Sequence, residues 1–96
     1  MIHSFADELT RRFAHKERVP EFLPFERLAL RKLAILESAT TLDDLRAAPM
    51  SGLQKFSEDE RIYWSLAITA QVKLCFRWEG GDAHDVSIRN YKSALH

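Results

Sequence analysis

The sequence has little cysteine, little glycine or proline and no long hydrophobic run, and each shortage excludes a class of protein. A single cysteine, Cys75, excludes an internal disulfide framework and is typical of a reducing cytoplasm. Three glycines and three prolines leave no room for a flexible linker. The longest apolar run, residues 33–36, is far shorter than the roughly 20 residues that cross a bilayer. Residues 1–8 lack the basic and apolar parts of a secretory signal. We therefore expect a single domain, residues 1–96, that is cytoplasmic and has no membrane partner.

The chain also has no net charge. Fourteen Lys and Arg residues balance fourteen Asp and Glu residues, so the formal charge at pH 7 is zero. Nucleic-acid-binding domains usually carry a basic excess, and bulk charge gives no argument for that function here. Any such function must depend on how the charges are distributed over the surface.

The first half of the chain has a helical hydrophobic period. Residues 7–18 predict a helix with Ala6, Leu9 and Phe13 on its inner side, and prolines at 20 and 24 end it. Residues 25–37 predict a second helix. The apolar face of this helix comprises Phe25, Leu28, Ala29, Leu33 and Leu36. Residues 41–46 predict a short helical turn with Thr41 as its N-cap.

The second half alternates with a period of two, which is typical of strands. Strands are predicted over residues 53–56, 63–69, 72–78 and 83–91, with a hairpin turn over 79–82. A short apolar stretch at residues 2–5 predicts a further strand. Helices followed by a strand meander predict an α+β fold, in which the N-terminal helices pack on one face of an antiparallel sheet of four to five strands.

Strand alternation also predicts a cationic surface. It places Lys73, Arg77, Arg89 and Tyr91 on the sheet face opposite the helices, while the acidic residues gather in the turns at 58–60 and 79–85. A neutral chain can therefore carry a basic face, although a register slip of one residue would invert this assignment.

The chain resembles the HigB toxins of bacterial toxin–antitoxin modules, which belong to the RelE-like superfamily. The similar segments occur in the family's order across nearly the whole chain. They are Ser4-Phe5-Ala6-Asp7, Leu30-Arg31-Lys32-Leu33, residues 39–46, Trp64-Ser65, Cys75-Phe76-Arg77-Trp78 and Gly81-Asp82-Ala83.

This resemblance implies a microbial RNase fold, cleavage of messenger RNA in the ribosomal A site, and a helix-turn-helix antitoxin of the HigA type as partner. It further implies metal-free chemistry without a cofactor, in which the 2′-hydroxyl of the RNA attacks the adjacent phosphate. Such a reaction needs a base, an acid and cations around the phosphorane.

The sequence departs from the family at several catalytic positions. The common ending Asp-Tyr-His of the last strand is Asn90-Tyr91-Lys92 here, and Gln54 stands where a histidine is usual. Two expected arginines are Ala67 and Lys73. Glutamine cannot carry a proton, so the loss of imidazole is the most consequential change. RelE-type relatives work without histidine, and this resemblance implies a set built on tyrosine, lysine and arginine.

Two sets of candidate residues follow. The catalytic candidates are Tyr91, Arg77, Lys73, Lys92 and Gln54, and the RNA-binding candidates are Lys55, Arg61 and Arg89. Two interpretations of Tyr91 are open: it acts as a base or phosphate ligand, or it is an ordinary aromatic residue of an edge strand. The four histidines lack metal-ligand spacing, so no metal site is expected. Two functions remain open: a ribosome-dependent mRNA endonuclease of full or reduced activity, and an inactive toxin fold that binds an antitoxin or the ribosome.

Overall fold

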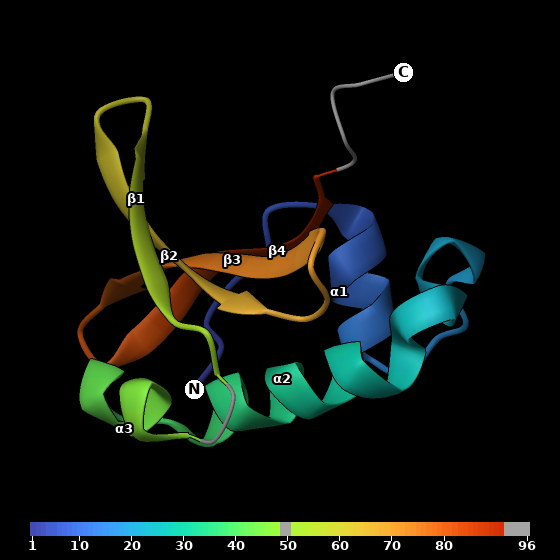
Figure 1. The fold of residues 1–96 in the computed structure, drawn as a ribbon, viewed down its shortest axis with the longest axis horizontal. Helices are drawn as coiled ribbons and strands as arrows, with labels where there is room; N and C mark the ends of the chain where they lie inside the picture. Colours follow the sequence, from blue (N-terminus) through green and yellow to red (C-terminus); the bar gives the residue numbers. More distant parts are fainter. Residues whose placement is uncertain (49–50, 92–96) are drawn as a thin grey trace.

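Four antiparallel strands in the order β1-β2-β3-β4 form the sheet. The computed structural model describes residues 1–48 and 51–91. The strands are β1 (Gln54–Glu58), β2 (Arg61–Ala67), β3 (Val72–Glu79) and β4 (Asp82–Asn90). The hairpin of β1 and β2 rises out of the body of the molecule, while β3 and β4 lie across the helices (Figure 1). The predicted α+β class is confirmed, with four strands in the sheet.

The first hairpin is longer than predicted. β1 continues to Glu58 and β2 begins at Arg61, because Asp59 and Glu60 alone make the turn, with φ of 51° and 64°. Two central residues with positive φ match the twist of a hairpin, and glycine or asparagine usually supplies them. Neither is present here, so the sequence gives no turn signal at this position.

The helices are α1 (Glu8–Ala14), α2 (Glu26–Ser38) and α3 (Leu42–Ala47), with a 3₁₀ helix, η1 (Pro20–Phe25), before α2. α1 ends four residues earlier than predicted, since Lys16 takes a φ of 70° and turns the chain. The predicted cap of α3 is confirmed. The Thr41 hydroxyl accepts a hydrogen bond from the Asp44 amide, and the Asp44 carboxylate accepts one from the Thr41 amide.

The core lies between the helices and one face of the sheet, with α2 and α3 beneath the strands in Figure 1. Its sheet side is made of the residues that alternation places inward, confirming the predicted strand faces. They are Leu66, Ile68, Val72, Leu74, Phe76, Val86 and Ile88. The predicted inward position is wrong for two residues of the helical half, since Ala6 is exposed and Leu28 is 42% exposed. Thr10 and Lys32 are buried instead.

The N-terminal segment covers the outer edge of β4. The strand predicted at residues 2–5 is reduced to two isolated parallel bridges, Ile2 to Ala83 and Phe5 to Val86. Beyond them, the Thr10 hydroxyl accepts a hydrogen bond of 3.0 Å from the Ile88 amide. A sheet edge capped in this way cannot pair with another strand, and the exposed edge of the sheet is therefore that of β1.

The other face of the sheet points away from the helices, and we call it the outer face. It carries alternate residues of all four strands, from Gln54 in β1 to Tyr91 just after β4. A register shift between Cys75 and Arg77 inserts one extra residue into β4 at Asp85, whose φ is 51°. Within the described ranges, no helix is long and apolar enough to cross a membrane.

Candidate functional site

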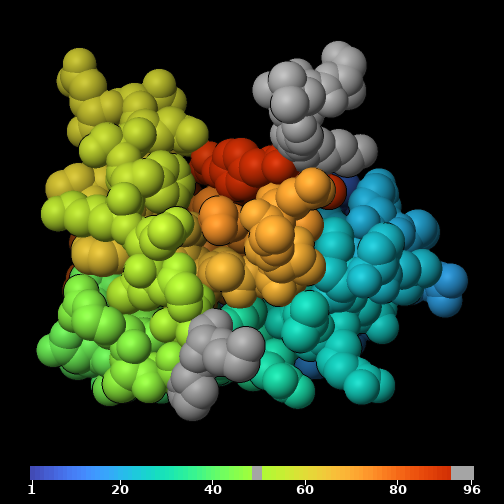
Figure 2. Space-filling view, viewed as in Figure 1, coloured from blue at the N-terminus to red at the C-terminus, as the bar shows by residue number. Residues whose placement is uncertain are grey.

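A hollow of about 640 Å³ lies on the outer face, between the protruding hairpin and the strands β3 and β4. Its volume is in the range of roughly 300–1,000 Å³ that is usual for small-molecule sites. The hairpin, β3 and the end of β4 meet on the face seen in Figure 2, where they are coloured yellow-green, orange and red. The hollow is lined by Gln54, Lys55, Phe56, Ser65, Lys73, Cys75 and Tyr91.

The hollow exists because small residues cross the middle of the sheet. Ser65 pairs with Cys75, and Cys75 pairs with Ser87, so the three lie in one row across β2, β3 and β4. Their exposures are 3%, 0% and 4%, although all three belong to the outer face. The neighbouring side chains are larger and shield this row from solvent. The row itself is low, so it forms a depression between these neighbours.

Tyr91 closes one side of the hollow. Its hydroxyl lies 3.8 Å from the Cys75 sulfur, and the residue remains 48% exposed. Desolvation raises the pKa of Tyr91, and the hydrogen bond with Cys75 raises it further, while Arg89 opposes the change. Burial likewise raises the pKa of the Cys75 thiol. Both groups are therefore protonated at neutral pH, and the Tyr91 hydroxyl can donate a hydrogen bond to an oxyanion.

Lys73 supplies the cation of the hollow. It is half-buried and lies opposite Arg89 on β4 and Ala67 on β2. None of the ion pairs among the described residues involves it. Gln54 reaches the same hollow from the edge strand β1. The structure thus brings together three of the five catalytic candidates: Gln54, Lys73 and Tyr91.

Lys55 points elsewhere, although it borders the hollow. Its cross-strand partner is Trp64, and its ammonium nitrogen lies 5.7 Å from the centroid of the Trp64 ring. Trp64 packs against the core, so the charge of Lys55 is directed toward the helix side of the hairpin. An aromatic face attracts a cation at this distance.

Arg89 stands beside the hollow and is held by a carboxylate from the hairpin. Its Nη1 donates a hydrogen bond of 2.8 Å to Glu58, which is 31 residues away in the sequence. Its Nε donates another of 3.1 Å to the Ser87 hydroxyl. The bond to Glu58 raises the pKa of Arg89 further above its ordinary value. The guanidinium group is therefore fixed in place and partly neutralised.

Arg77 is on the predicted face but not in the hollow. Its Nε donates a hydrogen bond of 2.8 Å to Asp85, and its Nη1 one of 3.4 Å to Glu79. The extra residue in β4 is Asp85 itself, and the Ser4 hydroxyl accepts a hydrogen bond from the Asp85 amide. The bulge thus directs this carboxylate toward Arg77, and the two acids neutralise a charge that alternation correctly placed on the outer face.

The last two candidates lie outside this group. Arg61 is exposed at the start of β2, opposite Glu58 and away from the residues that line the hollow. Lys92 falls outside the described residues.

Sequence reasoning missed Phe56, which lines the hollow, and the row of small residues beneath it. Three small residues at alternating positions of consecutive strands are the signal that could have found this row, once the register is known.

The chemistry available in the hollow is that of an anion site. Its described lining contains two lysines, of which Lys55 lies over the Trp64 ring, together with a phenol, a phenyl ring, a thiol, a hydroxyl and an amide, and it has neither histidine nor carboxylate. Such a set can bind a phosphate and stabilise added negative charge, but it offers no group that is basic near pH 7. Among the described residues, no cluster of three or more His, Cys, Asp or Glu could hold a metal ion.

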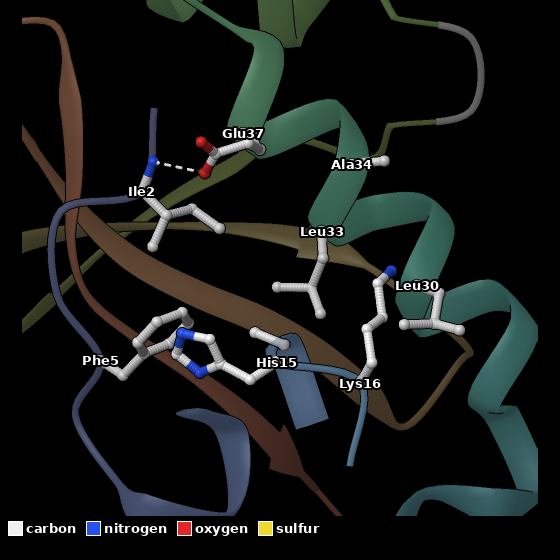
Figure 3. Close-up of a pocket in the computed structure, with 9 residues that line it drawn as sticks. Ile2, Phe5, His15, Lys16, Leu30, Leu33, Ala34 and Glu37 are labelled. Carbon is white, nitrogen blue, oxygen red and sulfur yellow. Dashed lines mark hydrogen bonds between the residues drawn. The ribbon is translucent and has the colours of Figure 1, made fainter. Parts of the chain in front are cut away.

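A second hollow, of about 440 Å³, lies between the N-terminal segment, the end of α1 and α2 (Figure 3). Its walls are largely apolar, with Phe5 and Leu33 facing each other across it. Its one carboxylate, Glu37, accepts a hydrogen bond of 2.9 Å from the Ile2 amide. This second hollow also has polar side chains in its lining, His15, Lys16 and Glu37, but its described lining contains none of the residues predicted from the sequence to be catalytic or RNA-binding.

The fold and the outer-face hollow define a small α+β protein with a phosphate-compatible site on an open antiparallel sheet. Comparison with protein families matches residues 3–91 to the RelE-like toxin of type II toxin-antitoxin system HigB. The match covers nearly the whole chain, so the protein belongs to this family of toxins, and the resemblance found in the sequence is confirmed. Membership implies an antitoxin as partner. A comparison with curated proteins found no match.

Proposed function

We propose that this protein is a ribosome-dependent mRNA endonuclease that acts in the cytoplasm as the toxin of its module. The observation that carries the proposal is the meeting of Lys73, Tyr91 and Gln54 in one hollow of a chain that belongs to the HigB-like toxins. The substrate carries its own nucleophile, the 2′-hydroxyl, so the protein need only position the RNA and stabilise charge.

Each residue has a role that fits its surroundings. Lys73 places a positive charge next to the non-bridging oxygens of the scissile phosphate, where negative charge grows in the transition state. Tyr91, which is protonated at neutral pH, donates a hydrogen bond to the phosphate or transfers its proton to the leaving 5′-oxygen. The proton of the attacking 2′-hydroxyl passes to water, because no described lining residue is basic at that pH. The Gln54 amide orients the nucleotide from the edge strand.

The absence of a base among the described lining residues predicts slow cleavage. General base catalysis typically contributes about 10²–10⁴-fold to a rate, and neither a phenol of raised pKa nor an amide supplies it at neutral pH. The remaining acceleration comes from orientation and from the cations. We therefore propose an activity weaker than that of a site containing histidine, with the ribosome as the platform that orders the mRNA.

The second candidate function is a binding module without nuclease activity. The observation that favours it is the neutralisation of two outer-face arginines, Arg77 by Asp85 and Glu79, and Arg89 by Glu58. In that case the outer face would bind RNA or the ribosome without cutting. In both cases we propose a helix-turn-helix antitoxin of the HigA type as the protein partner.

Primer extension on a defined mRNA, translated by purified ribosomes in the presence of the purified protein, distinguishes the two functions. The endonuclease predicts new 5′ ends within codons, and Tyr91→Phe lowers their yield by about 100-fold because the proton donor is lost. Lys73→Gln has an effect of similar size because the phosphate loses its cation. Arg46→Gln, which removes one positive charge from α3, serves as the control and leaves cleavage unchanged.

The outcome separates the alternatives clearly. Intact transcripts with the wild-type protein, together with co-purification on ribosomes, would identify a binding module and refute the endonuclease. Equal cleavage by wild type and Tyr91→Phe would show that the hollow is not the catalytic site.

A further inference from the structure

Two aromatic rings lie on the outer face, away from the core. Phe56 of β1 and Tyr63 of β2 are cross-strand partners, and their rings are stacked at a centroid distance of 5.5 Å and an angle of 20°. Both are half-buried, and neither belongs to the core cluster or to the partly buried residues packed against it. Cross-strand aromatic pairs stabilise a hairpin, but that role does not require a position beside a hollow.

A cation is fixed against this pair. The guanidinium carbon of Arg89 lies 5.9 Å from the centroid of Phe56 and 5.7 Å from that of Tyr63. Its hydrogen bonds to Glu58 and Ser87 hold it there. The result is a rigid unit of two rings and one guanidinium group, which we call the aromatic shelf: Phe56, Tyr63 and Arg89.

The aromatic shelf opens into the hollow. Phe56 has Tyr63 stacked on it and itself lines the hollow, which also contains Lys73 and Tyr91. The floor of small residues keeps the space clear. Phe56 therefore lines one hollow together with the ammonium group of Lys73 and the phenol of Tyr91, a combination that suits a flat apolar group next to a phosphate.

We propose that the aromatic shelf binds an unpaired RNA base, by stacking on Phe56, next to the phosphate held by Lys73 and Tyr91. Single-stranded nucleic acids are bound by this combination of aromatic platforms and cations, and stacking tolerates any base because every base has a π-face. The proposal rests on the proposed function and deepens it, since it assigns the contact that fixes one nucleotide relative to the reacting phosphate.

The test uses a short single-stranded RNA that carries 2-aminopurine, whose fluorescence falls when the base stacks on a ring. Wild-type protein quenches the fluorescence on binding. Phe56→Leu keeps the apolar volume but removes the ring, so it weakens binding by about 10-fold and abolishes the quenching. Phe56→Tyr, which keeps a ring, restores both. An RNA of equal length with an abasic site at the probe position binds wild type and Phe56→Leu equally.

Two results would overturn the proposal. One is that Phe56→Leu quenches the fluorescence as strongly as wild type does. The other is that Phe56→Leu loses as much affinity for the abasic RNA as for the RNA that carries 2-aminopurine. A thermal melt of each variant separates loss of the site from loss of the fold. Cleavage on the ribosome is measured in parallel. Cleavage by wild type without any stacking signal refutes the shelf alone, whereas stacking without cleavage refutes the endonuclease and leaves the shelf as an RNA-binding site.

Discussion

At the scale of single residues, two weak acids shape the hollow, the small and buried Cys75 and the larger, partly exposed Tyr91. Cys75 is completely buried on the floor, and the hydroxyl of Tyr91 reaches over it. Desolvation is the largest cause of the raised pKa of each. A thiol in this position is a weak nucleophile, since the thiolate is the reactive form. A role for Cys75 as a catalytic nucleophile is therefore not expected.

The raised pKa values predict the behaviour of the protein in alkali. Since the folded state holds the Cys75 proton more tightly than the unfolded chain, this contribution is complete below the ordinary pKa of 9.0 and is lost as pH rises through the folded pKa. Tyr91 acts in the same direction above its ordinary value of 10.0. The free energy of unfolding therefore falls as the pH rises above about 8, and it falls less in Cys75→Ser, whose hydroxyl does not titrate.

Urea denaturation followed by tryptophan fluorescence at a series of pH values measures this difference. The two curves, for wild type and Cys75→Ser, are expected to diverge only above about pH 8. Parallel curves over the whole range would show that the thiol is not desolvated in the folded protein.

The residue scale also shows how far the site could be predicted. Alternation along β3 and β4 correctly placed Lys73, Arg77 and Arg89 on one face with Tyr91, because strand parity is a local property. The partners of the two arginines could not be predicted. Glu58 meets Arg89 across 31 residues of sequence, and Asp85 meets Arg77 only because of a bulge.

At the scale of elements, the sequence predicts which segments are helices and strands more accurately than it predicts the residues at which they begin and end. α2 and α3 were placed to within one or two residues, since periodicity and a capping box mark them. The end of α1 and the turn between β1 and β2 were missed. Both are made by charged residues with positive φ, Lys16 in the first and Asp59 and Glu60 in the second, and such residues rarely adopt this conformation.

Gly52 joins the helical half to the sheet, and its substitution has a predictable cost. Gly52 and Gly80 share a φ of 61°, so alanine at either position is strained by roughly 1–2 kcal/mol. An added Cβ at Gly52 would lie 2.9 Å from Cβ of Ala67, whereas at Gly80 it meets nothing within 4 Å. Next to this contact, the Ser51 carbonyl accepts a hydrogen bond from the Ala67 amide.

We therefore expect Gly52→Ala to destabilise the protein more than Gly80→Ala does, by about a further 1–3 kcal/mol for the forced shift of β1 against β2. Thermal or urea denaturation of the two variants measures the difference, and Gly80→Ala is the matched control for backbone strain. Equal losses of stability would indicate that the start of β1 moves freely, and that the hairpin does not depend on this close approach.

At the scale of the whole molecule, zero net charge conceals an arrangement of paired charges. The outer face carries the cations that strand parity predicts, but among the described residues Arg77 and Arg89 are bound to carboxylates, whereas Lys73 in the hollow is in no ion pair. The long-range attraction for a polyanion is therefore small in the free protein. Under the proposed function, the phosphates of a bound RNA would compete with Glu58 for Arg89, whose Nη1 donates a hydrogen bond to that carboxylate.

This competition makes Glu58 a residue whose removal should strengthen RNA binding. In Glu58→Gln, Arg89 loses its ionic partner and is free to contact a phosphate, so we expect tighter binding of single-stranded RNA, by about 5-fold, and a salt dependence steeper by about 0.7 in the logarithmic slope. Glu60→Gln changes the net charge equally at the exposed hairpin turn and is the control. Fluorescence anisotropy of a labelled RNA at several salt concentrations measures both quantities. If the two variants bind alike, Glu58 acts only through net charge, and Arg89 takes no part in holding the RNA.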